Sequence, residues 1–205
     1  MLSEWRGNNT TLTILHEYKV RLTAASGGLV LAEQPQNSRI DAICYLQGAC
    51  LQARIAIELL FFALLSSRNP IESSLLGSTW TTEHRPASIK RKLERTQIRY
   101  WPERITTTKH NNNTWQASSR QDVITPAEAI KFYGNLSDAL HAKRNFVIGD
   151  DALSENDWIK NGMAGLRDQT DHFALYSEDL CKHIITMRWG EDNAPHLVTL
   201  APKNR

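Results

Sequence analysis

An arginine and a histidine near residue 170 are the side chains of this sequence whose types and spacing best suit chemistry. They are Arg167 and His172, in the run RDQTDH. Histidine exchanges a proton near neutral pH and arginine keeps its positive charge, so the two types together could serve acid–base chemistry beside an anion. On a continuous helix, however, their side chains would be separated by about 140° around the axis. The alternative interpretation is two solvated residues on a helix surface.

The same run resembles the signature of the HEPN superfamily, which comprises helical-bundle ribonucleases of prokaryotic defence and toxin–antitoxin systems. That signature is an arginine, usually followed by a polar residue, and then a histidine after four to six intervening positions, as in Arg167, Asp168 and His172. The resemblance implies that His172 and Arg167 activate the RNA 2′-hydroxyl and stabilise the phosphate transition state, normally across a dimer.

A second run, 132–144 (FYGNLSDALHAKR), also looks like a segment of HEPN-like helical proteins, with no role assigned to it. Gly134 lies inside this predicted helix, where glycine costs about 1 kcal/mol relative to alanine. We therefore expect Gly134 to permit the close approach of another helix. His141 follows the apolar residues Leu136 and Leu140, and we expect it to be a structural histidine at the boundary of the core.

Cations and aromatic residues are interleaved between residues 85 and 104, which is the composition that phosphate contacts and base stacking require. The candidate nucleic-acid-binding residues are Lys90, Arg91, Arg95, Arg99 and Trp101. Ile89 and Leu93 also give this segment an apolar stripe, and Glu94 dilutes its charge. The alternative is therefore an ordinary solvated face of a helix.

No pattern in the sequence indicates a metal or cofactor site. A Gly-rich phosphate loop, an HExxH motif and a recognisable Ser or Cys nucleophile are all absent, and the seven histidines lack metal-ligand spacing. The three cysteines, Cys44, Cys50 and Cys181, are odd in number and lack CxxC spacing. They are expected to be reduced core thiols of a cytoplasmic protein. The net charge of +2 does not by itself imply a nucleic-acid or membrane partner.

These side chains must be positioned by helices, and the strongest helix signal is the apolar stretch 40–65. Its second half is apolar on every side except at Glu58, which predicts a helix surrounded by protein. The apolar run is too short for a membrane span, and Arg54 interrupts any longer window. Arg54 and Glu58 are one turn apart, so we expect a pair at the rim of the core or a polar spot kept for a partner. A capping box at Ser38 and Asp41 predicts the start of this helix.

Other elements follow from capping and periodicity. Thr125, Pro126 and Glu128 predict a helix start, with the helix running to Arg144. Apolar steps of four and three over 159–187 predict a long helix whose seam packs within the protein or against a second chain.

Short strands and turns are predicted elsewhere. Gly27-Gly28 is expected to break the chain, after which 29–32 has strand character. A β-hairpin is predicted over 104–119, and a further strand over 196–201. That last strand is expected to pair with 187–189 or with 29–32.

Together these patterns predict an all-α fold, a bundle of four to five helices with a short β-hairpin appendage. It forms a single domain over 1–205 with a polar insertion at about 71–124, which covers one side. The favoured function is a non-enzymatic interaction or regulatory subunit of a bacterial multi-protein system, and the resemblance points to antiviral defence. A protein partner or a homo-oligomer is expected, with no membrane and no cofactor.

Two alternative functions stay open at this point. One is a metal-independent HEPN-type ribonuclease acting through Arg167 and His172. The other is a nucleic-acid-binding adaptor acting through residues 85–104.

Overall fold

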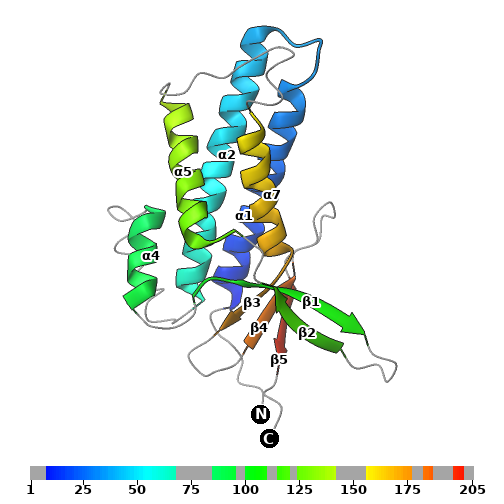
Figure 1. The fold of residues 1–205 in the computed structure, drawn as a ribbon, viewed down its shortest axis with the longest axis vertical. Coiled ribbons are helices and arrows are strands. Elements are labelled where there is room, and N and C mark those ends of the chain that lie inside the picture. Colours follow the sequence, from blue (N-terminus) through cyan, green and yellow to red (C-terminus); the bar gives the residue numbers. More distant parts are fainter. Residues whose placement is uncertain are drawn as a thin grey trace, which may run out of the picture.

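A computed structural model describes residues 8–67, 85–95, 100–109, 115–120, 124–141, 156–176, 182–186 and 196–200. These residues are mostly helical, as predicted. The helices are α1 (Asn8–Ala32), α2 (Arg39–Ser66), α4 (Pro86–Arg95), α5 (Pro126–Leu140) and α7 (Asp157–Asp171). The strands are β1 (Glu103–Lys109), β2 (Trp115–Arg120), β3 (His172–Tyr176), β4 (Lys182–Thr186) and β5 (His196–Leu200). Helices α1, α2, α5 and α7 lie along the long axis, the sheet lies at one end, and α4 lies beside α2 and α5 (Figure 1).

α1 and α2 form a helical hairpin, and α1 is longer than predicted. The expected break at Gly27-Gly28 and the expected strand at 29–32 are both wrong, because α1 continues through them to Ala32. Gly28 lies against α2, where an added Cβ would stand 3.2 Å from both the Ala49 Cβ and the Tyr45 carbonyl oxygen. Gly28 is therefore a position of close packing between the two helices, and not a break in the chain.

α2 is the central helix, and its predicted start is confirmed. The Ser38 hydroxyl accepts from the Asp41 backbone N–H at 3.2 Å, and the Asp41 carboxylate accepts from the Ser38 backbone N–H at 3.3 Å. The helix ends at Ser66. Its core face contains Ile57, Leu60 and Phe61, all fully buried.

The cysteines of α2 differ from expectation. Cys50 is buried, and this burial raises the pKa of its thiol to about 12. Cys44 is exposed, because it lies on the outer face of α2, which corrects its assignment to the core. Cys181 lies outside the described residues.

α2 is also, among the residues described, a helix long and apolar enough to cross a membrane by length and composition. Its core face is buried against α1, α4 and α5, which is sufficient to account for the composition of that face.

α5 begins as predicted, with Thr125 as N-cap and Glu128 completing the capping box. It ends at Leu140 rather than at Arg144, and residues 142–144 lie outside the described part of the chain. Gly134 makes no close helix contact, since nothing lies within 4 Å of a Cβ added there. His141 follows as an exposed C-cap residue, not a buried one.

α7 packs against α1 and α5 and stops much earlier than predicted. Leu166 faces the core, and its carbonyl oxygen accepts a hydrogen bond from the buried Tyr18 hydroxyl at 3.1 Å. The helix ends at Asp171, and His172 begins β3, so the predicted continuous helix to residue 187 is wrong. The backbone of 172–176 pairs with β4, and this pairing replaces helical hydrogen bonding.

The strands form one antiparallel sheet in the order β2-β1-β3-β4-β5. The predicted hairpin at 104–119 is confirmed, with Arg104 paired to Arg120 and Lys109 to Trp115. A strand is also present at 196–200, but it pairs with 182–186 and not with 29–32. The β part is therefore a five-stranded sheet, larger than the predicted appendage.

Candidate functional site

A polar cluster joins α2 to α5 at the rim of the core. Arg54 and Glu58 form the predicted pair, with 3.5 Å between the Arg54 Nε and the Glu58 Oε1. The Tyr133 hydroxyl donates to Glu58 Oε1 at 2.8 Å and accepts from Arg54 Nε at 3.2 Å. The guanidinium carbon of Arg54 lies 5.1 Å from the centroid of the Tyr133 ring. Tyr133 thus connects the two helices through both members of the pair.

The electrostatics of this cluster keep the Tyr133 phenol in its protonated form. Burial, together with the hydrogen bond to the Glu58 carboxylate, raises the pKa of Tyr133. Its phenol therefore stays protonated at neutral pH and donates its hydrogen bond to Glu58. The side chains of Arg54 and Glu58 remain 31% and 25% exposed. Within the described part of the chain, the two Nη groups of Arg54 have no hydrogen-bond partner.

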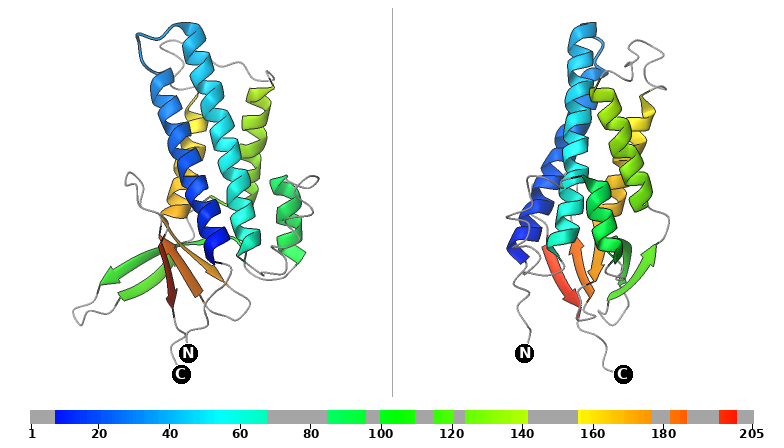
Figure 2. Two further views of the ribbon diagram at one scale, coloured as in Figure 1. Left: turned by 180° about the vertical axis from the view of Figure 1, so that it is seen from behind. Right: turned by 90° about the vertical axis from the view of Figure 1, so that its left-hand side faces the viewer.

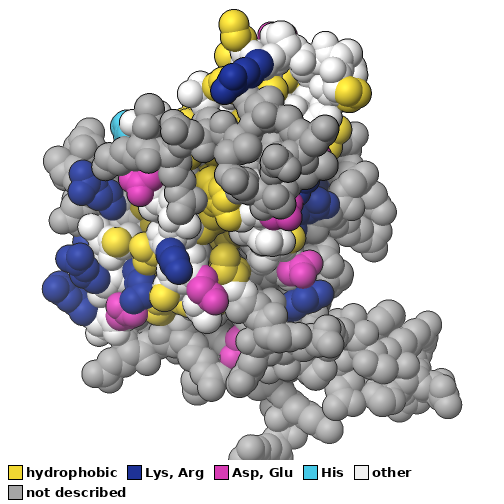
Figure 3. All heavy atoms as spheres, turned by 45° about the horizontal axis from the view of Figure 1, so that its top comes forward, with side chains coloured by type: hydrophobic (Ala, Val, Ile, Leu, Met, Phe, Trp, Pro, Cys, Tyr) yellow, Lys and Arg dark blue, Asp and Glu magenta, His cyan; other side chains and the backbone are white. Residues whose placement is uncertain are grey.

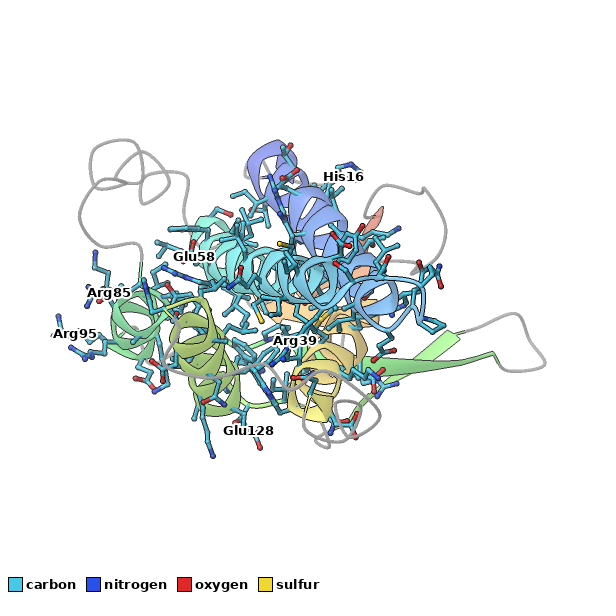
Figure 4. All side chains as sticks on the ribbon, turned by 90° about the horizontal axis from the view of Figure 1, so that it is seen from above. His16, Arg39, Glu58, Arg85, Arg95 and Glu128 are labelled. Atoms are coloured by element: carbon cyan, nitrogen blue, oxygen red, sulfur yellow. The ribbon has the colours of Figure 1, made fainter. Side chains whose placement is uncertain are left out.

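The predicted nucleic-acid residues are split between two locations. Arg91 and Arg95 are exposed on α4, while Lys90 is paired with Glu94. Figure 4 shows Arg85 and Arg95 projecting from the outer side of α4, away from Glu58 on α2. Arg99 lies outside the described residues.

Trp101 packs inward against α2. Its ring centroid is 5.5 Å from that of the buried Phe61, and its Nε1–H donates to the Ile124 carbonyl oxygen at 2.9 Å. This tryptophan anchors the chain ahead of β1. Stacking on a base would require that packing to open.

Arg167 and His172 stand on either side of a junction between helix and strand. Arg167 belongs to α7, whereas the backbone of His172 is the first of β3 and pairs with Thr186. The side chain of His172 lies outside the described part of the structure. Nearby, Arg104 Nη1 of β1 lies 3.8 Å from Asp168 Oδ2, which connects the sheet to the end of α7.

An open groove of about 720 Å³ lies between α5 and α7. Phe132 and Trp158 line its floor, with ring centroids 6.0 Å apart in an edge-to-face arrangement. Hydrogen bonds from the Thr125 backbone and side chain lower the pKa of Glu128 at its rim. Among the described residues, no group of three His, Cys, Asp or Glu side chains is arranged to hold a metal ion. The groove thus combines an aromatic floor with a polar rim.

Comparison with known protein families, with functionally characterised proteins and with solved structures gives no match for this chain. The geometry of the described residues is therefore the basis for the functional proposal.

Proposed function

We propose that this protein is a non-enzymatic interaction or regulatory subunit of a bacterial multi-protein system, and that it meets its partner through the outer surface of the α1–α2 hairpin. One observation carries the proposal. Among the helix and loop side chains whose exposure the structure describes, which leave out most of the sheet, the large exposed hydrophobic ones all lie on α1 or α2; these are Val20, Val30, Leu31, Ile40 and Leu51. Single exposed hydrophobic residues are normal on any surface, but their concentration on one helical hairpin is typical of interaction sites.

The middle of the hairpin carries little charge at its exposed positions, whereas the exposed Glu33, Arg39 and Asp41 lie toward its tip. Between Ala42 and Ala53 the exposed residues of α2 are Cys44, Gln47, Gly48 and Leu51, none of them acidic or basic. Between Val20 and Leu31 the exposed residues of α1 are also uncharged. Depletion of charge marks the centre of protein–protein interfaces.

Figures 2 and 3 show how the outer surface of α1 and α2 lies in the molecule. Figure 2 (left) shows α1 and α2 in front of the other helices, with no drawn helix or strand over their outer side. Figure 3 shows hydrophobic side chains at the surface at the upper end of the molecule, where α1 connects to α2. A partner can therefore reach this surface.

Position-specific photo-crosslinking tests the proposal. A photoreactive amino acid at Val20 or at Leu51 of the full chain is expected to give a discrete crosslinked protein in native-host cells. The matched control is Ala164, which is exposed on α7 and does not line the groove. Crosslinks of equal yield at all three positions, or none at Val20 and Leu51, would contradict the proposal.

A metal-independent ribonuclease is the second candidate, and one observation favours it. Because α7 ends at Asp171, Arg167 and His172 are not held on opposite flanks of one straight helix. If the ribonuclease function is correct, expression is toxic, RNA is cleaved in the presence of a chelator, and His172→Ala abolishes both effects while circular dichroism stays unchanged. An inert purified protein and harmless expression would exclude this candidate.

A further inference from the structure

We infer that the outer face of α4 binds the phosphate backbone of duplex DNA without reading its sequence. This face is separate from the surface of the proposed function, which concerns α1, α2 and a protein partner. Three features of residues 85–95, called the α4 segment below, carry the inference. They are a concentration of positive charge, arginines without a partner among the described residues, and the burial of the apolar side chains.

Positive charge is concentrated in the α4 segment. Five basic residues and one acidic residue give it a net charge of +4, whereas the whole chain has a net charge of +2 and the rest is therefore net negative. The basic residues are Arg85, Lys90, Arg91, Lys92 and Arg95. Figure 3 shows Lys and Arg side chains gathered at the left of the view, the side on which α4 lies in Figure 1. Charge concentrated in this way attracts a polyanion.

Two arginines lie on the outermost side of α4. Ile89 and Leu93 are buried, and Arg91 and Arg95 are exposed on the opposite side of the helix. Arg91 and Arg95 are four residues apart, which is a rise of about 6 Å along the helix axis. The phosphates of a DNA strand follow each other about every 3.4 Å along the duplex. The two arginines can therefore contact separate phosphates.

The arginines of this face have no competing partner within the described part of the chain. Arg85, Arg91 and Arg95 make no hydrogen bond or ion pair with a described residue. Figure 4 shows Arg85 and Arg95 projecting outward from α4. Lys90 differs, since it is paired with Glu94. A guanidinium group binds phosphate through two parallel hydrogen bonds, and these three can do so without first breaking a contact to a described residue.

The apolar face of α4 argues against a membrane as the anionic partner. A basic helix that lies on a membrane buries an apolar face among the lipids. In α4 that face is already used, because Ile89 and Leu93 are 2% and 1% exposed and pack in the core. The exposed residues of the α4 segment are all charged; they are Arg85, Arg91, Lys92, Glu94 and Arg95. Such a face suits a partner that is bound through its phosphates alone.

The same composition favours duplex DNA among the nucleic acids. Single strands are bound by stacking bases on aromatic side chains, but Tyr100 and Trp101 pack against the hydrophobic core. Duplex RNA is recognised partly through its 2′-hydroxyl groups, and the exposed residues of the α4 segment include no hydroxyl or amide side chain. Binding to duplex DNA without sequence preference requires only cations on its phosphates.

Fluorescence anisotropy of the purified full chain with a short labelled DNA duplex of mixed sequence tests the inference. The wild-type chain is expected to bind the duplex. The logarithm of the association constant is expected to fall against the logarithm of the salt concentration with a slope of about −3, because three arginines each displace about one counterion. A second duplex of unrelated sequence is expected to bind equally well.

Arg91→Gln combined with Arg95→Gln removes two of the inferred phosphate contacts, and glutamine retains helix propensity. The slope is expected to become shallower by about 2, and the affinity at about 0.1 M salt is expected to fall about 10- to 100-fold. The matched control is Arg39→Gln combined with Lys131→Gln, which makes the same change in net charge at exposed positions of α2 and α5. This control is expected to keep the wild-type slope.

Glu94→Gln tests the face in the opposite direction. This change removes the acidic residue of the α4 segment and releases Lys90 from its pair. The slope is expected to become steeper by about 1, and the affinity at about 0.1 M salt is expected to rise about fivefold. Unchanged or weaker binding by Glu94→Gln would place the DNA elsewhere on the protein.

The remaining outcomes each contradict a different part of the inference. A wild-type chain that does not bind DNA at low salt, or equal slopes for the two double variants while both are folded by circular dichroism, overturns it. Tighter binding at the same salt concentration to vesicles containing phosphatidylserine makes a membrane the partner instead. Tighter binding to single-stranded DNA or to duplex RNA overturns the choice of duplex DNA. The crosslinks at Val20 and Leu51 test the proposed function independently of all these results.

Discussion

Gly162→Ala is expected to destabilise the protein, because Gly162 of α7 lies directly against Phe132 of α5. A Cβ at this position would stand 2.5 to 2.7 Å from three atoms of the Phe132 ring. Phe132 is only 6% exposed, and its ring packs edge to face against Trp158. Trp158 holds one edge of the ring, so any shift of the ring must be accommodated by the groove that both side chains line.

Two opposing terms set the size of this effect. Overpacking of this kind costs about 1–3 kcal/mol. Replacing a helical glycine by alanine returns about 1 kcal/mol through helix propensity. We expect a net loss of about 1 kcal/mol for Gly162→Ala. Gly134→Ala is the matched control, since it gains the same propensity and meets nothing within 4 Å, so it is expected to stabilise by about 0.5–1 kcal/mol.

Denaturant unfolding followed by circular dichroism measures both variants. The propensity term cancels between them, so their difference of about 1–3 kcal/mol reports the clash with Phe132 alone. In a Phe132→Leu background the clash is relieved, and Gly162→Ala is then expected to be neutral or stabilising. If Gly162→Ala stabilised the wild-type chain as much as Gly134→Ala does, the packing of α7 on α5 described above would be wrong.

Three further predictions concern buried groups. Phe61→Ala is expected to cost about 2–5 kcal/mol of unfolding free energy, since the fully buried ring leaves a cavity, and an unchanged denaturation midpoint would contradict its core position. Burial raises the pKa of Tyr18, so its contribution to stability is complete below about pH 10 and is lost as the pH rises above that. Thermal melts above pH 10 are therefore expected to fall more steeply for the wild type than for Tyr18→Phe, and parallel slopes would refute this. In a Cys181→Ser chain, a thiol reagent is expected to modify the exposed Cys44 well before Cys50, whose pKa is raised by burial to about 12, and equal rates would argue against the placement of α2.

Helix starts were the features most accessible to sequence reasoning. Ser38 with Asp41, and Thr125 with Glu128, predicted the first turns of α2 and α5 correctly. A capping box is a local interaction between a side chain and the backbone three residues away, so no knowledge of the rest of the fold is needed.

Features that depend on distant contacts were not predictable in the same way. The glycine pair at 27–28 is typical of a chain break, but packing on α2 keeps it helical. The four-and-three spacing across 159–187 suggested a single helix, whereas strand pairing takes over at His172. Both errors arise because tertiary packing and sheet formation override local pattern.

The candidate site also combines a local contact that the sequence predicts with distant contacts that it does not. Arg54 and Glu58 could be paired from their separation of one helical turn. Tyr133 is 75 positions from Glu58, and no local pattern connects them, although Tyr133 lies in a run that the sequence singles out. Trp101 has the residue type of a base-stacking surface, yet its partner Phe61 belongs to a distant helix.

The hydrogen bond from Tyr18 to the Leu166 carbonyl has a consequence for how the chain reaches its folded state during synthesis. Its two ends are 148 positions apart. The hairpin of α1 and α2 can close once residue 66 has left the ribosome. The apolar side of α1 that packs against α7 is covered only after most of the remaining chain has been synthesised. During that interval the Tyr18 ring and hydroxyl stay solvated. A nascent chain halted before α7 is therefore expected to be the form most readily bound by chaperones that recognise exposed apolar helices.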